Sequence, residues 1–151
     1  MFLDWVLASL HHLAAFSLAA ILAAEFTLIR NAMDARTIAR LSRIDLHYGL
    51  TAGLVIVFGG LRVFFGAKGY EYYLANHVFW TKMALFAAIA VLSIPPTLKF
   101  AAWRRRSAAD ATFRPEAAAV RSVRRSLWIQ AGLFLLIPVA AAAMARGYGM
   151  G

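Results

Sequence analysis

The chain has 151 residues, 62% of them hydrophobic, no cysteine and a formal net charge of +9. The lack of cysteine excludes disulfides, thiolate metal sites and cysteine nucleophiles. The mean hydropathy of +0.68 and the hydrophobic share exceed those of soluble domains. Because Lys and Arg collect in the cytoplasmic loops of membrane proteins, the basic charge does not indicate a nucleic-acid partner.

Four apolar segments are long enough to cross a bilayer, since a transmembrane helix needs about 20 mostly apolar residues. They cover about residues 5–29, 47–65, 77–100 and 127–145. We therefore predict an all-α integral membrane bundle of four transmembrane helices, with residues 1–151 as a single domain. The first segment lacks a basic n-region and is too long for a cleaved signal peptide, so it is read as a span.

Charge distribution predicts the orientation of these spans. The first and third connections, at about residues 30–45 and 101–126, are flanked by 12 of the 16 basic residues. The positive-inside rule therefore places these connections in the cytoplasm and both termini on the periplasmic side of a bacterial inner membrane. Residues 69–76 are expected to lie flat on the outer surface. The tyrosines expected at the outer interface are Tyr70, Tyr72, Tyr73 and Tyr148.

Small and polar residues in the second span allow two local predictions. Gly49 and Gly53 form a small-xxx-small pair, which is typical of positions where a neighbouring helix approaches closely in lipid. Asp45 is expected near the start of the helix, where a negative charge suits the helix dipole.

Ionisable side chains within spans are unfavourable in lipid and are therefore functional candidates. On a helical wheel Glu25 lies about 40° from His11 and about 140° from His12. His11 and Glu25 thus share the face that is expected to point into the bundle, and His12 points elsewhere. Glu25 is a candidate proton relay. Salt bridging and capping are the alternative for the inner group that it forms with Asp45 and nearby cations.

The predicted orientation brings six basic groups to the outer half of the bundle, with only Asp4 and Glu71 near them. They are His11, His12, Arg62, His77, Lys82 and Arg146. Such a cluster favours an anion with an apolar body, such as a porphyrin, a quinone or an anionic lipid headgroup. Imidazole can ligate haem iron, with His11 as first candidate and His12 or His77 as alternatives, while Arg and Lys hold the propionates. The cations near helix ends could instead snorkel to headgroups.

Five runs of the sequence resemble a family of bacterial four-helix membrane proteins of unknown function, over nearly the whole chain. They are LHHLAAFSLAAILAAEFTLIR (10–30), GLRVFFGAKGYEYY (60–73), FWTKMALF (79–86), SIPPTLKFAAW (93–103) and MARGYG (144–149). This resemblance implies a fold and a location, and no activity.

More distantly, the chain resembles the HemJ membrane protoporphyrinogen oxidases and the CopD-like copper-resistance proteins. Trp5, Leu10-His11 and Trp80-x-Lys82 can be laid onto the HemJ motif. That resemblance implies an oxidoreductase with haem b, in which His11 is the haem ligand and Lys82 a functional partner. With the ionisable residues of the spans included, the candidate catalytic residues are Lys82, Arg62 and Glu25. His11 and His77 are the candidate metal ligands. Two HemJ signatures, Leu-Pro-Arg and Asn-Glu-x-Pro, have no counterpart here.

The leading hypothesis is therefore an inner-membrane protein that binds haem or takes part in a redox reaction. The alternative is a non-catalytic accessory or assembly subunit in a larger respiratory or photosynthetic complex, or a homo-oligomer, in the lipid bilayer. Transport of copper or another ion is less favoured, because the five methionines form no evident pathway.

Overall fold

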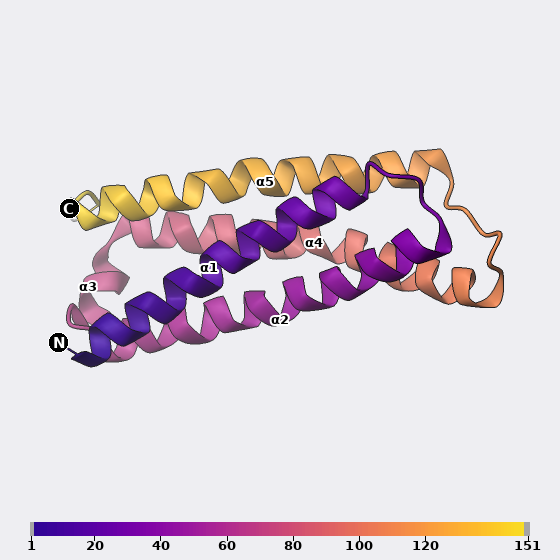
Figure 1. The fold of residues 1–151 in the computed structure, drawn as a ribbon. Helices are drawn as coiled ribbons and strands as arrows, with labels where there is room; N and C mark the ends of the chain where they lie inside the picture. Colours follow the sequence, from indigo (N-terminus) through magenta and orange to yellow (C-terminus); the bar gives the residue numbers. More distant parts are fainter. Residues whose placement is uncertain (1, 150–151) are drawn as a thin grey trace.

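The computed structural model describes residues 2–149. Its helices are α1 (Phe2–Leu28), α2 (Ala35–Phe65), α3 (Gly69–Ala75), α4 (His77–Ala109) and α5 (Ala117–Ala145). The four long helices run up and down and pack in the ring order α1, α2, α4, α5 (Figure 1). Each is long and apolar enough to cross a membrane. The predicted all-α bundle with four membrane spans is confirmed.

The bundle has two chemically different ends. Both termini and α3 lie at one end, the terminal end, and the connections 29–34 and 110–116 lie at the other, the basic end (Figure 1). At the basic end the helices are longer than the predicted spans: α2 begins at Ala35 and α4 continues to Ala109. The 31 residues of α2 make about 46 Å of helix, against about 30 Å of hydrocarbon. Most of the basic residues expected in loops therefore lie on projecting helical turns.

The start of α2 corrects one expectation. Asp34 is the N-cap, and its carboxylate accepts a hydrogen bond of 2.7 Å from the Thr37 N–H. That bond holds the pKa of Asp34 below its usual range, because it stabilises the charged form. Asp45 was expected near this helix start. It lies about three turns inside α2 and is only 8% exposed, so the helix dipole does not explain it.

Helix α4 continues through Pro95 and Pro96 without a break. Because Pro96 has no N–H, the Leu92 carbonyl four residues earlier loses its helical partner. Helix α5 replaces that partner: Ser126 Oγ donates to the Leu92 carbonyl at 2.7 Å and Gln130 Nε2 donates at 3.3 Å. In lipid, where no water can satisfy the carbonyl, these bonds tie α5 to α4.

The expected close approach of helices at Gly49 and Gly53 is not found among residues 2–149. Both residues are exposed, and a Cβ at either position would meet nothing within 4 Å. The close approach on α2 occurs at Gly59, where a Cβ would lie 3.2 Å from Cε1 of His11.

The terminal end is closed by contacts around Asn76, which is fully buried. Its Oδ1 accepts hydrogen bonds from the N–H groups of Val78 and Phe79, which caps α4. Its Nδ2 donates to the Tyr148 carbonyl at 3.1 Å. Gly149 packs beside it with φ of +89°, and a Cβ there would lie 2.6 Å from Val78 Cγ2. Asn76 therefore joins the start of α4 to the C-terminal segment.

Replacing Asn76 by alanine should lower the stability of the bundle by about 1–3 kcal/mol, because a cap is lost and buried donors are left unpaired. Thermal unfolding of the purified protein in detergent would measure the change. Asn31→Ala, at an exposed position in the first connection, is the matched control. Equal unfolding temperatures for the two variants would contradict the assigned role of Asn76.

Candidate functional site

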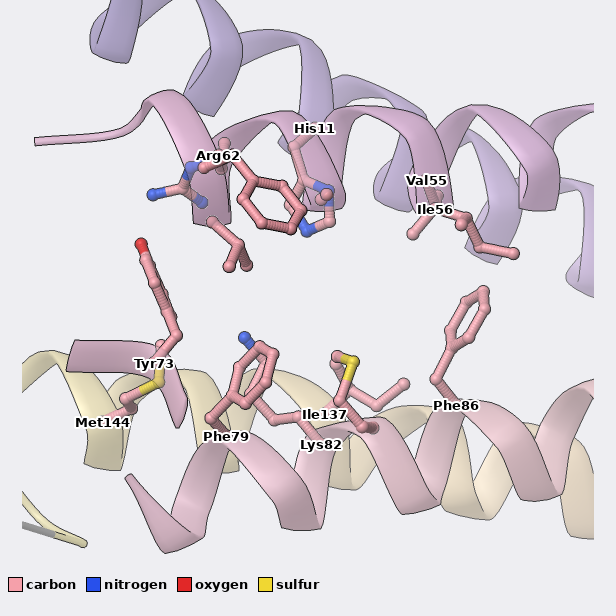
Figure 2. A pocket seen from close by; sticks show the side chains of 15 residues that line it. His11, Val55, Ile56, Arg62, Tyr73, Phe79, Lys82, Phe86, Ile137 and Met144 are labelled. Atoms are coloured by element: carbon pink, nitrogen blue, oxygen red, sulfur yellow. The ribbon is translucent and has the colours of Figure 1, made fainter. Parts of the chain in front are cut away.

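A cavity of about 340 Å³ lies between α2 and α4 near the terminal end (Figure 2). Its apolar walls include Val55, Ile56, Phe79, Met83, Phe86 and Ile137. Three basic side chains line it from three different helices: His11 from α1, Arg62 from α2 and Lys82 from α4. Among the residues that the structure describes, no aspartate or glutamate lines this cavity.

His11 reaches the cavity because Gly59 has no side chain. The imidazole passes beside this glycine, whose Cβ would lie 3.2 Å from Cε1 and 3.5 Å from Nδ1. The Val55 carbonyl is close to the ring, but its geometry does not complete a hydrogen bond, and Nδ1 is buried without a partner. Figure 2 shows a ring nitrogen directed into the space between α2 and α4.

Arg62 and Lys82 lie on opposite walls of the cavity (Figure 2), close enough for their charges to repel. Nε of Arg62 is buried without a hydrogen-bond partner. The two acids expected nearby are engaged elsewhere: Asp4 accepts the Ala67 N–H at 3.2 Å, and Glu71 accepts the hydroxyl of its neighbour Tyr70. The cavity thus combines apolar walls with positive charge that the surrounding side chains do not neutralise.

The other three members of the expected outer cluster do not join the cavity. His12, His77 and Arg146 are exposed and are not among its lining residues. His12 faces away from the bundle interior, as the helical wheel predicted. Within residues 2–149, no group of three or more His, Asp or Glu side chains is placed to hold a metal ion, so His11 and His77 do not form part of such a group.

Tyr73, one of the tyrosines expected at the outer interface, lies in the cavity wall. It is 7% exposed, and its ring centroid lies 5.6 Å from that of Phe79. Figure 2 shows its hydroxyl directed toward Arg62. The sequence offered no signal for this placement, because it depends on how α3 folds back across the end of the bundle.

Glu25 shares the buried face of α1 with His11, as predicted, but lies 14 residues away, about 21 Å along the helix. The cations expected to pair with it and Asp45 face outward. Arg30 is exposed with its guanidinium 5.9 Å from the Phe26 ring centroid, and His47 bonds to the carbonyl of Arg43. Salt bridging therefore does not account for the two carboxyl groups.

Replacing Gly59 by alanine should displace the His11 ring and destabilise the α1–α2 contact by about 1–3 kcal/mol, as overpacking does elsewhere. The midpoint of thermal unfolding in detergent should fall. Gly53→Ala, on the same helix with open space around it, should leave the midpoint unchanged or raise it. A Gly59→Ala protein as stable as Gly53→Ala would contradict the close contact with His11.

Comparison with known proteins identifies the family of the chain. A family model described as "Predicted membrane protein (DUF2214)" matches residues 3–149. No curated protein and no solved structure matches the chain.

Proposed function

Because the chain belongs to the DUF2214 family of predicted membrane proteins, a description that states a location and no activity, we propose a function from the cavity itself. The protein binds an anionic molecule with a large apolar body between α2 and α4. The ligand that its residues suit best is haem b, with His11 as the iron ligand.

One observation carries this proposal: within residues 2–149, an imidazole whose Nδ1 has no hydrogen-bond partner shares an apolar cavity with two cations and no acidic side chain. A buried polar group without a partner is unfavourable, and a buried cation without a counter-ion more so. A ligand that offers a metal and carboxylates would satisfy all three groups. Haem offers both, since imidazole ligates its iron and Arg62 and Lys82 would bind its propionates.

The size and donor set of the cavity define how such a ligand would be held. A volume of about 340 Å³ is near the lower end of ligand pockets, which is about 300 Å³. A porphyrin held there would also contact the apolar walls of the cavity. Among the described residues His11 is the one histidine that lines the cavity, so it would be the protein's ligand to the iron.

Only two of the residues that carry the HemJ resemblance lie at the cavity. His11 and Lys82 line the cavity. Trp5 and Trp80 are 65% and 53% exposed, and the indole N–H of Trp80 donates to the Leu74 carbonyl, as an interfacial tryptophan would. The support for haem therefore comes from the cavity residues and not from the whole motif.

Absorption spectroscopy of the protein purified from haem-replete cells tests the ligand. The wild type should show a Soret band, with α and β bands after dithionite reduction, at about one haem per chain. His11→Ala should lose these bands, whereas His12→Ala, the exposed neighbour, should keep them. A colourless wild type, or equal haem content in both variants, would contradict the assignment. Replacing Lys82 by alanine should weaken haem binding about tenfold or more, but should leave binding of haem dimethyl ester unchanged.

We also place this cavity in the periplasmic half of the inner membrane, because the basic end should face the cytoplasm. The natural lack of cysteine allows a direct test with three exposed alanines. Ala67→Cys at the terminal end should react with a membrane-impermeant maleimide in spheroplasts. Ala32→Cys and Ala111→Cys at the basic end should react only after the membrane is permeabilised. The reverse pattern would invert the orientation.

A further inference from the structure

The helices α1 and α2 bring two carboxyl groups to the same level inside the bundle. His11 on α1 lies beside Gly59 on α2. Glu25 is 14 residues after His11 on α1, and Asp45 is 14 residues before Gly59 on α2. Because the two helices are antiparallel, Glu25 and Asp45 lie at the same level of the bundle. Their charges are close enough to interact.

This pair is buried, and its two members have different partners. Glu25 is 1% exposed and its Oε1 has no hydrogen-bond partner. Asp45 is 8% exposed and accepts a hydrogen bond of 2.8 Å from the Thr97 hydroxyl. A donated hydrogen bond favours a charged carboxylate, so Asp45 is the better place for a negative charge and Glu25 for a proton.

No counter-ion compensates the pair among the described residues. Helix α4 presents Thr97, and helix α5 presents Gln130, both of them neutral. On α2, the other titratable group that faces the pair is Tyr48, whose hydroxyl donates to Gln130 Oε1 at 3.2 Å. Arg30 and Arg43 are exposed. Two adjacent carboxylates without a cation cannot both stay ionised in a medium of low dielectric constant.

We propose that Glu25 and Asp45 form a proton-binding site near the basic end of the bundle, in which Glu25 holds a proton beside an ionised Asp45. Binding or release breaks and forms only the carboxyl O–H bond, with water as the partner, so no oxidant or other co-reactant is needed. The site is distinct from the cavity at the terminal end, and its test does not depend on whether haem binds there.

The surroundings of the pair allow this proton to exchange with the basic end. Glu25 lies three residues, about 5 Å of helix, from Leu28, where α1 ends. Tyr48 donates a hydrogen bond to Gln130, and Gln130 donates one to Ser126. Ser126 lines a second cavity of about 220 Å³. Lys99 and Arg125 line the same cavity, and water in it would supply the exchange path that this proposal requires.

Infrared spectroscopy of the full-length protein in lipid vesicles tests this site. The chain has seven acidic residues, and the five outside this pair lie in terminal or connecting segments, away from the interior of the bundle. The wild type at neutral pH should therefore show the C=O band of one protonated carboxyl group. The band should shift in D₂O and disappear reversibly as the pH is raised.

Three samples assign the band. Glu25→Gln should lose it, because Asp45 then ionises without an acidic neighbour, whereas the matched control Glu116→Gln, at an exposed cap of α5, should keep it. If Glu25→Gln does not fold, wild-type protein labelled with ¹³C at the glutamate carboxyl should show the band displaced. Four results would each overturn the proposal. They are the absence of a protonated carboxyl band at neutral pH, a band retained in Glu25→Gln, a band unmoved by the label, and a band that neither titrates nor responds to D₂O.

Discussion

The antiparallel register of α1 against α2 determines where the polar side chains of this bundle meet. Three pairs lie at matching steps along α1 and α2: Asp4 with Gly66, the C-cap of α2, His11 with Gly59, and Glu25 with Asp45. A slip of one residue would turn each α1 side chain by about 100° relative to α2. His11 would then leave the gap at Gly59, and Glu25 would leave Asp45. Both the cavity and the carboxyl pair depend on this one contact.

The register separates charges of opposite sign along the membrane-spanning part of the bundle. His11, Arg62 and Lys82 lie at one level, and the two carboxyl groups lie at another, about 21 Å away along α1. Because this distance is shorter than the hydrocarbon thickness of about 30 Å, both levels cannot reach the headgroups at once. At least one level therefore lies in the hydrocarbon, where charged groups are unfavourable without a local partner. The proposed anionic ligand would supply that partner for the cations, and the proposed proton would supply it for the carboxyl groups.

Hydropathy and helical periodicity predicted much of this arrangement. The four spans followed from apolar runs, and the buried face of α1 followed from the 100° step that joins His11 to Glu25. The helix ends at the basic surface were missed, because a hydropathy pattern stops at the first charges while the backbone continues as helix. The same effect misplaces Asp45: the hydropathy pattern puts it near a helix start, whereas α2 begins at Ala35.

Which outer cations converge could not be predicted from depth alone. Six basic groups were expected at one level, but only those directed between α2 and α4 line the cavity. Which basic residues line the cavity depends on the ring order of the helices and on the side of each helix that faces its neighbour. The hydropathy pattern of one span contains neither. The inward turn of Tyr73 likewise depends on the path of α3. The sequence therefore predicted that basic side chains form the site, but it did not predict which of them line the cavity.

Native mass spectrometry of the protein released from its own membrane tests the central claim most directly, because it does not presume which ligand binds. The account predicts one bound molecule of defined mass on the wild type and on His12→Ala, its loss from His11→Ala, and a smaller bound fraction on Lys82→Ala. A wild type that carries only the mass of the polypeptide, or the same lipids bound to all four proteins, would contradict the claim that this cavity holds a specific anionic ligand.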